Sequence, residues 1–255
     1  MAQAIRLKCL LRSPASSRSL ARLSMASEPK PHRLILTSCG LVSQPLKAEF
    51  RRMLGGDSAG KTVWYLPTAP LRDGMGPRWV ERQVDSLKRE FGFGKMAVVD
   101  PEYVKGENLK KELAALGHID VIYAEMGNTY NLRHHLRDSG GDQLVYDAMD
   151  AGAVYVGSSA GSIVAGRTVQ IAFWKNWDDQ TAEGTINVNW RDPKLGAGLN
   201  IAGGRSFLPH ANGQYGNKAW QDEQARRHGH DDHEVIRLAD GEGFVIDGDK
   251  AYLAC

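Results

Sequence analysis

The chain has 255 residues, of which 42% are hydrophobic and 24% charged, and its 32 basic and 30 acidic residues leave a formal net charge of +2. This is an ordinary globular composition, and the length allows one sizeable core but only marginally two domains. A net charge this small predicts no polyanionic partner, so nucleic-acid binding is not expected.

Basic residues gather at the N-terminus. Residues 1–27 contain five arginines and lysines, six serines and no acidic residue, so the rest of the chain carries a net negative charge. This composition is typical of an organellar transit peptide and predicts a mitochondrial or plastid location, whereas without such a leader the protein is expected to be cytoplasmic. A disordered tail, or a true start at Met25, is the alternative. We therefore separate residues 1–28 from the domain predicted over residues 29–255.

Short apolar runs alternate with helical patterns from residue 33 onward. The pattern predicts amphipathic helices over 44–56 and 77–92, and strands over 33–39, 61–69, 95–100, 119–125 and 153–158. Alternation at this spacing is typical of βαβ units with a parallel sheet. The segment 233–255 instead has two Asp-Gly turns between β-like runs, which predicts an antiparallel meander. The expected fold class is therefore α/β, a single-domain three-layer sandwich with a mainly parallel central sheet and a C-terminal β meander.

The strand expected at 153–158 runs into Gly-Ser-Ser-Ala-Gly, a G-x-S-x-G motif centred on Ser159. A nucleophile elbow turns sharply from strand to helix, so its neighbours must be small, and it lifts the serine oxygen above the sheet edge. The helix N-terminus behind it favours developing negative charge. Glycine-rich turns also bind phosphate or simply connect two elements. The motif alone therefore favours a nucleophilic serine without requiring one.

A serine nucleophile also needs oxyanion donors. Gly127 lies in a turn that follows another expected strand, and its backbone amide could lie beside the elbow. The second amide would be that of Ala160, directly after the serine. The next helix is expected to begin at Asn128 or Thr129, which are both good N-cap residues.

The base that activates the serine must be sought among eight histidines. His210, in Leu-Pro-His, follows a short apolar run at what is expected to be a further strand end, which favours it as the base. His228, His230 and His233 match no recurring zinc spacing and are expected in a solvated loop. No metal site is predicted from the sequence.

Three segments together resemble the aspartyl dipeptidase (peptidase E) and cyanophycinase family of serine peptidases. They are MGNTYNL at 126–132, VGSSAGSIVAG at 156–166 and LPHAN at 208–212. The resemblance covers nearly all of residues 32–255. It implies a flavodoxin-like, class I glutamine amidotransferase-like fold. It also implies hydrolysis of a peptide bond after a small, often acidic, N-terminal residue, without metal or cofactor.

The resemblance also implies a role for individual residues. It makes Ser159 the nucleophile and His210 the base. Gly127 and Ala160 would donate their backbone amides to the oxyanion, and Asn128 and Thr129 would line the substrate pocket. The third triad member is expected between the serine and the histidine, in a loop after the elbow helix. Asp178 and Asp179 are adjacent there and either could orient the histidine, while Asp192 is a less favoured candidate.

Two departures separate this chain from an Asp-X dipeptidase. Glu125 and Met126 stand where glycines are common, and Asp222 and Glu223 lie near the arginine expected to read a substrate aspartate, where acidic groups would repel it. The leading prediction is a serine dipeptidase acting on short peptides, with N-terminal Asp-X as one option. A cyanophycinase-like amide hydrolase and a catalytically silent binding member are the alternatives. The expected partner is a small peptide, with neither nucleic acid nor membrane; a homodimer is possible.

Overall fold

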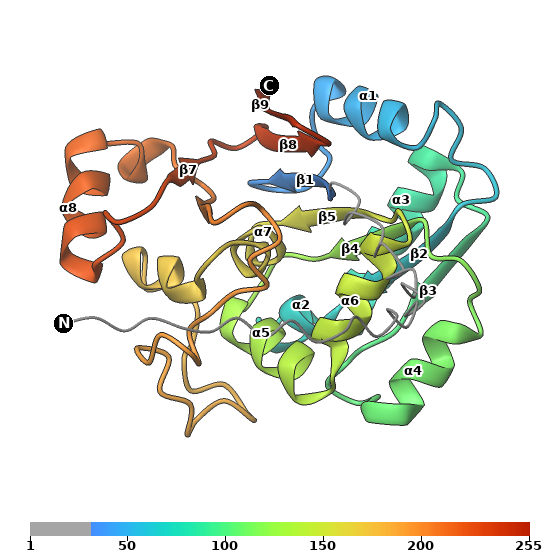
Figure 1. Cartoon of the computed structure of the whole chain (residues 1–255), viewed down its shortest axis with the longest axis horizontal. Helices are drawn as coiled ribbons and strands as arrows, with labels where there is room; N and C mark the ends of the chain where they lie inside the picture. Colours follow the sequence, from blue (N-terminus) through green and yellow to red (C-terminus); the bar gives the residue numbers. More distant parts are fainter. Residues whose placement is uncertain (1–31) are drawn as a thin grey trace, which may run out of the picture.

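The computed structural model describes residues 32–255, and the leader predicted over residues 1–28 lies outside the described residues. Seven strands form one sheet in the order β3-β2-β4-β5-β1-β8-β9 (Figure 1). In chain order they are β1 Arg33–Thr37, β2 Thr62–Leu66, β3 Lys95–Val98, β4 Val121–Ala124, β5 Val154–Ser158, β8 Gly243–Asp247 and β9 Lys250–Ala254.

The strands from β3 to β1 run parallel, whereas β8 pairs antiparallel with β1 and β9 pairs antiparallel with β8. Apart from the first residue of β1 and of β2, every residue of β1, β2, β4 and β5 is buried, which explains why these strands read as continuous apolar runs. The predicted α/β class with a mainly parallel central sheet is confirmed, and the fold is flavodoxin-like.

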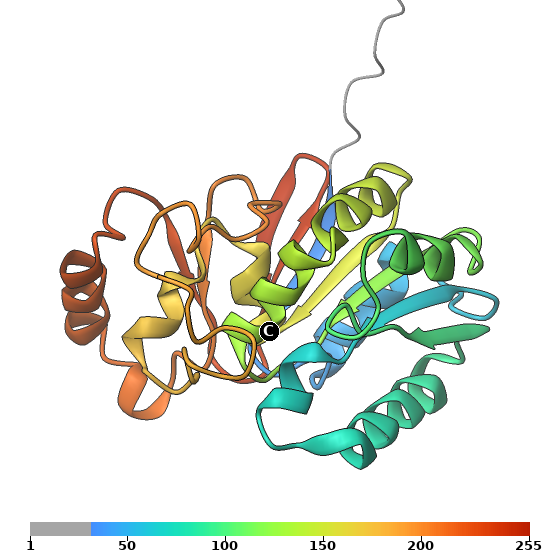
Figure 2. The same cartoon turned by 90° about the horizontal axis from the view of Figure 1, so that it is seen from below.

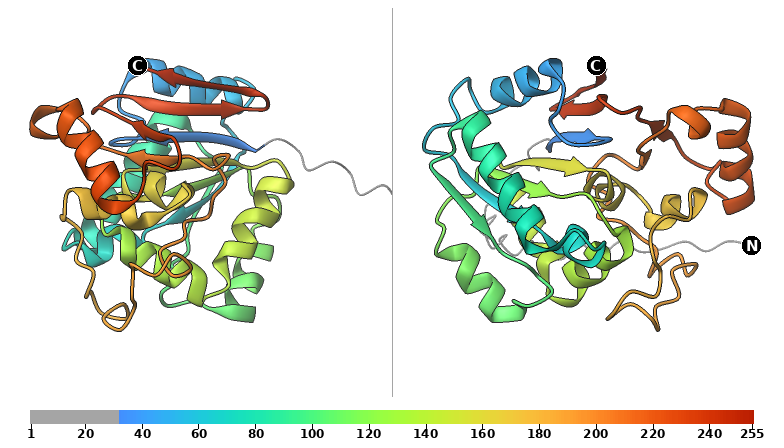
Figure 3. Two further views of the ribbon diagram at one scale, coloured as in Figure 1. Left: turned by 60° about the vertical axis from the view of Figure 1, so that its left-hand side comes forward. Right: turned by 180° about the vertical axis from the view of Figure 1, so that it is seen from behind.

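Helices cover both faces of this sheet (Figures 2 and 3). On one face, α1 (Gln44–Met53) and α3 (Gly76–Phe91) bury their apolar stripes against the sheet. The helices that contribute buried side chains to the other core cluster include α4 (Gly106–Ala114), α5 (Thr129–Asp138), α6 (Gly141–Asp150) and α7 (Ala160–Ala165). A short helix, α2 (Thr68–Arg72), follows β2. This layering places the carboxyl ends of the parallel strands at one edge, where α/β proteins bind ligands.

The segment between α7 and β8 forms a smaller unit with a sheet of its own. It contains the 3-10 helix η1 (Val169–Trp174), strand β6 (Ser206–Leu208), the 3-10 turn η2 (Gly213–Tyr215), helix α8 (Lys218–His228) and strand β7 (Val235–Arg237). β6 and β7 pair in parallel as a separate two-stranded sheet. The predicted C-terminal meander is therefore wrong for β7, because α8 connects it to β6 as a crossover. The prediction of antiparallel C-terminal strands is confirmed for the β8–β9 hairpin. No helix within residues 32–255 combines the length and apolar character that a membrane crossing requires.

Candidate active site

Ser159 lies between β5 and α7, at the carboxyl edge of the large sheet. Its backbone has φ 44° and ψ −100°, a conformation that few non-glycine residues adopt, and its N–H donates to the Thr37 carbonyl at 3.0 Å. The flanking glycines are required by space: a Cβ on Gly157 would lie 2.7 Å from the Ser162 nitrogen, and one on Gly161 would overlap the Ala124 carbonyl. The motif therefore forms the strained strand-to-helix turn that the sequence predicts.

His210 follows β6, and the structure brings it to Ser159 from the small sheet. The distance from His210 Nε2 to Ser159 Oγ is 3.1 Å. His210 also has a positive φ, 53°, and its backbone N–H donates to Ser38 Oγ at 2.7 Å. A base within hydrogen-bond reach is the geometry that activates a serine.

Asp240, between β7 and β8, provides the acid beside the histidine. Its Oδ1 lies 2.7 Å from His210 Nδ1 and accepts the Ser38 hydroxyl at 2.7 Å. Burial raises the pKa of the Asp240 carboxyl, but the hydrogen bonds from Ser38 and His210 outweigh this, and the pKa is lowered. The carboxyl is therefore held ionised beside the imidazole, as the acid of a triad must be.

The acids expected for this position lie elsewhere, which corrects the sequence prediction. Asp178 accepts the backbone N–H of Thr129 at 2.9 Å. The Asp179 carboxylate caps Thr181, and Asp192 accepts the backbone N–H groups of its own turn. Asp178 thus bonds to the N-terminus of α5 and not to His210, and the order along the chain is serine, histidine, acid. The sequence marked neither Asp240 nor Ser38, because Asp240 has the pattern of an Asp-Gly turn.

Two backbone amides point to an oxyanion hole. Gly127 has φ 129°, and a Cβ there would lie 2.5 Å from the Ala69 backbone, so only glycine fits. The first N–H groups of a helix have no intrahelical acceptor, and Ala160 opens α7. Among the described residues, no hydrogen bond is found for the amides of Gly127 and Ala160. Two amides without an acceptor in the described part of the chain are what an oxyanion hole requires.

Asn128 and Thr129, expected in the substrate pocket, are both buried, and neither is among the residues that line the pocket beside Ser159. Asn128 is the N-cap of α5: its Oδ1 accepts the Asn131 N–H at 3.0 Å, and its Nδ2 donates to the Asp179 carbonyl at 2.9 Å. Both ends of this amide are thus bonded within the protein. These residues hold the Gly127 turn and the loop after η1 together.

Glu125, which stands where family members commonly have glycine, is buried next to this turn. Its carboxyl accepts the Met126 N–H at 2.9 Å and the Tyr65 hydroxyl at 2.8 Å. Burial raises the pKa of Glu125. The side chain supports the turn from the α1–α3 side of the sheet and does not face Ser159's pocket.

A small pocket opens beside Ser159 and His210. The other residues that line it are Ile163, Ile171, Ala172, Lys175, Trp177, Asp178, Leu208 and Pro209. Most of its lining side chains are apolar, and Lys175 and Asp178 are the basic and acidic residues of the lining besides the histidine. Lys175 donates to the Pro209 carbonyl, and its Nζ lies 4.6 Å from the Trp177 ring centroid. Burial lowers the pKa of Lys175 to about 8.

The family follows from a comparison with known sequences. Residues 34–254 match the model of peptidase family S51. The chain belongs to this family. S51 is a family of serine peptidases, and a serine on a nucleophile elbow is the feature that such a family requires.

Relatives of this S51 chain are peptidases by name. "Uncharacterized peptidase Lin0382" of Listeria innocua is 33% identical over 57% of this chain and 64% of its own length, just under two thirds. "Uncharacterized peptidase Lmo0363" of Listeria monocytogenes is 30% identical over 70% of this chain and 78% of its own length.

Solved structures share the fold. The crystal structure of a "Putative Peptidase E Protein" from Listeria monocytogenes EGD-e has a TM-score of 0.64 and 22% identity, covering 87% of this chain and 97% of the other. A peptidase from an acI-B1 actinobacterium has a TM-score of 0.60 and 16% identity, with 88% of both chains covered. At these identities the likeness is one of fold.

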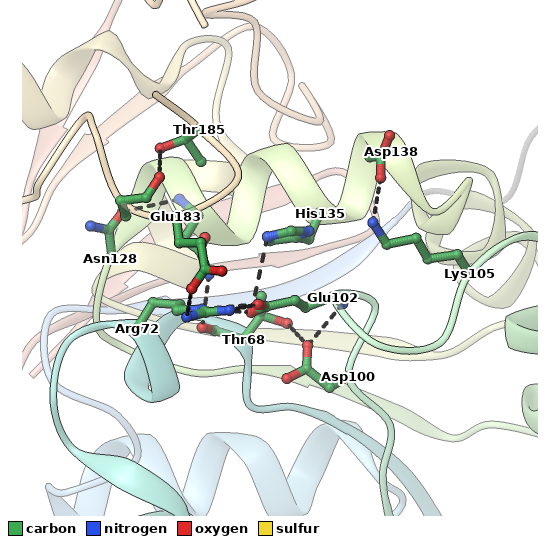
Figure 4. Close-up of polar contacts among 12 residues, drawn as sticks. Thr68, Arg72, Asp100, Glu102, Lys105, Asn128, His135, Asp138, Glu183 and Thr185 are labelled. Carbon is green, nitrogen blue, oxygen red and sulfur yellow. Dashed lines mark hydrogen bonds and ion pairs between the residues drawn. The ribbon is translucent and has the colours of Figure 1, made fainter. Parts of the chain in front are cut away.

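A second polar cluster of this S51 chain lies between α2 and α5 (Figure 4). Arg72 Nε donates to Glu102 at 2.9 Å, and its Nη1 reaches Glu183 at 2.8 Å. Glu102 Oε2 is 3.9 Å from Nε2 of the buried His135. Burial raises the pKa of Glu102, but Arg72 outweighs it and the pKa is lowered; burial also lowers the pKa of His135 to about 4. The cluster fastens the loop that carries Glu183 to the body.

Part of this cluster has ligand groups that could hold a metal ion. Ligand atoms of His134, His135 and Asp138 lie within 4.8 Å of one another. Lys105 already forms an ion pair with Asp138 at 2.6 Å, and Arg72 occupies the neighbouring Glu102. These two cations neutralise the carboxylates that a metal would need, so we interpret the cluster as an ion-pair network.

Proposed function

We propose that this S51 peptidase is a dipeptidase that hydrolyses short peptides through Ser159, His210 and Asp240. One observation carries the proposal: a continuous hydrogen-bonded path runs from Ser159 Oγ through both nitrogens of His210 to Asp240 Oδ1, with distances of 3.1 and 2.7 Å. This is the arrangement of nucleophile, base and orienting acid on which serine hydrolases of unrelated folds converge.

The chemistry follows from the positions of these atoms. Ser159 Oγ attacks the scissile carbonyl carbon while its proton passes to His210 Nε2, and the carboxylate of Asp240 stabilises the imidazolium. The amides of Gly127 and Ala160 stabilise the oxyanion, and each such donor typically contributes about 3 kcal/mol. The imidazolium then protonates the leaving amine. Water repeats the sequence on the acyl-enzyme and releases the acid product.

The small size of the pocket beside Ser159 supports short substrates. Its mostly apolar lining and the loop carrying Trp177 and Asp178 leave room for a small group beside the nucleophile. The resemblance to aspartyl dipeptidases favours cleavage of a dipeptide, and Asp-X stays one of the substrates to be tested. The intact hydrogen-bonded path speaks against a catalytically silent member.

The test is labelling of the full-length protein with a fluorophosphonate, followed by a dipeptide library that includes Asp-X. We expect the wild type to react, and Ser159→Ala and His210→Ala to lose the label. Ser158→Ala is the matched control, because the neighbouring serine is fully buried and belongs to the same motif, so its labelling should persist. A folded wild type that neither takes the label nor cleaves any dipeptide would overturn the proposal.

A further inference from the structure

An exposed tryptophan borders the base of the candidate triad. Trp177 lies in the loop after η1, at the rim of the pocket that contains Ser159 and His210. It is 53% exposed, whereas tryptophan is on average a highly buried residue. Its ring centroid is 5.6 Å from that of His210, and the two ring planes are inclined by 49°. A large apolar surface therefore faces solvent directly beside the catalytic imidazole.

The exposed indole is held in one orientation. Its Nε1 donates to the Tyr215 hydroxyl at 2.9 Å, and the two rings meet edge to face with their centroids 4.9 Å apart. Lys175 Nζ lies 4.6 Å from the Trp177 ring centroid and 5.0 Å from that of Tyr215. The same ammonium donates to the Pro209 carbonyl. A ring that is already fixed by such contacts does not have to be ordered when a ligand packs on it, which favours binding.

The proposed mechanism places the leaving part of the substrate on the same side of the nucleophile. The imidazolium must lie within hydrogen-bond reach of the leaving nitrogen in order to protonate it. His210 Nε2 is 3.1 Å from Ser159 Oγ, so the leaving nitrogen and the residue attached to it lie against the imidazole. Trp177 is the aromatic side chain that pairs with this ring among the described residues. The side chain of the leaving residue therefore reaches the indole.

We infer that Trp177, supported by Tyr215, binds the side chain of the residue that the enzyme releases with a new amino group, and that this residue is aromatic. The inference rests on the proposed hydrolase function and deepens it by naming the substrate class, dipeptides with an aromatic second residue. An aromatic side chain covers more of the exposed indole than a small aliphatic one does. It also adds the attraction between two rings in offset or edge-to-face contact.

The test compares dipeptides that differ only in the leaving residue. All have the N-terminal residue that the library identifies as best, followed by phenylalanine, alanine or glutamate. They form the same acyl-enzyme, so their kcat/KM values differ only through the steps up to acylation. The wild type should hydrolyse the phenylalanine peptide with a kcat/KM about 10-fold above that of the alanine peptide. Equal values for these two, or a higher value for the glutamate peptide, which Lys175 would attract, would overturn the inference.

Variants of Trp177 assign the preference to this side chain. The readout is the ratio of kcat/KM for the phenylalanine and alanine peptides within each protein, so a general loss of activity cancels. Trp177→Ala should lower the ratio from about 10 to about 2, and Trp177→Phe, which keeps a ring, should retain most of it. Ile186→Ala is the matched control, because Ile186 lies in the same loop and is 67% exposed but does not line the pocket. A ratio that stays at the wild-type value in Trp177→Ala would overturn the inference.

The two proposals fail differently in this experiment. A fluorophosphonate contains no leaving residue, so its reaction reports the triad alone. Labelling without a preference for the aromatic peptide removes the Trp177 inference and leaves the hydrolase. Absence of both labelling and hydrolysis in the wild type removes both. Trp177→Leu keeps apolar bulk without a ring and should also lose the preference, so the comparison can be made even if Trp177→Ala does not fold.

Discussion

Ser38 connects the two groups that flank His210 and limits how the imidazole can turn. Its hydroxyl donates to Asp240 Oδ1 and accepts the backbone N–H of His210, both at 2.7 Å. The side chain is fully buried, directly after β1. One hydroxyl therefore fixes the backbone of the base and the carboxylate of the acid relative to the large sheet. Such supporting contacts give a catalytic group its geometry.

Asp240→Asn should separate the observed acid from those that the sequence favoured. The amide removes the negative charge and leaves His210 free to take the wrong tautomer, so we expect the rate of fluorophosphonate labelling to fall about 10³- to 10⁴-fold. Asp179→Asn and Asp192→Asn should label at the wild-type rate. The rates are measured at pH 7.5 by intact-protein mass, with circular dichroism as the folding control. Normal labelling of Asp240→Asn would exclude this residue from the triad.

Single residues with a local motif could be predicted, and those defined by distant contacts could not. Ser159 was identified by its small neighbours, and His210 by its place at an expected strand end. Asp240 reaches His210 only because β7 and β8 lie in different sheets and the chain between them passes the carboxyl edge. His230, expected in a solvated loop, is 4% exposed. The histidine spacing did not indicate that Trp174, far away in the sequence, packs against the His230 ring.

At the scale of elements, the turn that carries Gly127 depends on a close approach to α2. The Cβ of an alanine would lie 2.5 Å from the Ala69 backbone, and its φ of 129° strains any other residue. Gly127→Ala should therefore shift the oxyanion amide and lower the labelling rate about 10²- to 10³-fold. Gly74→Ala is the control, because Gly74 also has a positive φ but no atom within 4 Å of an added Cβ. Equal labelling by the two variants would show that this turn does not serve the reaction.

The packing of η1 against the end of α8 should make stability depend on pH. Trp174 Nε1 donates to His230 Nδ1 at 3.0 Å, so protonation would place a hydrogen on the nitrogen that now accepts the bond, facing the indole N–H. Burial lowers the pKa of His230 from 6.5 to about 4. Between these values the unfolded chain binds more protons than the folded one, so the free energy of unfolding falls as the pH is lowered.

Urea titrations at pH 7.5 and pH 5.0 would measure this effect. We expect the wild type to lose about 1 kcal/mol from His230 over this range, after discounting for partial solvation. His230→Asn should start from a lower stability at pH 7.5 but lose less on acidification. His135, whose pKa is also lowered to about 4, contributes in the same direction in both proteins. An unchanged difference between wild type and variant at the two pH values would contradict the prediction.

The alternation of strands and helices was enough to predict the large sheet, because parallel strands buried on both faces leave long apolar runs in the sequence. The small sheet was not predicted. β6 and β7 have three residues each, and the partly buried β7 has no alternation that distinguishes it from a hairpin strand. Their pairing is decided by α8, whose apolar pattern is weak, so the crossover could not be recognised in advance.

For the whole molecule, the candidate site exists only while the two sheets stay together. Ser159 and Ser38 directly follow strands of the large sheet, His210 follows the small sheet, and Asp240 lies on the segment that joins the two sheets. The rings of Phe207 in β6 and Phe244 in β8 are 5.8 Å apart and belong to the core that both sheets share. Loosening this contact should separate His210 and Asp240 from Ser159 before the large sheet unfolds.

Phe207→Ala tests this dependence. Removing a fully buried aromatic ring should lower the free energy of unfolding by about 3–5 kcal/mol. In urea, we expect this variant to lose fluorophosphonate labelling at a lower concentration than its circular dichroism signal. Phe91→Ala is the matched control, because Phe91 packs on the opposite face of the large sheet, in the α1–α3 core. Its labelling and circular dichroism should disappear together. Coincident transitions in Phe207→Ala would mean that the two sheets unfold as one unit.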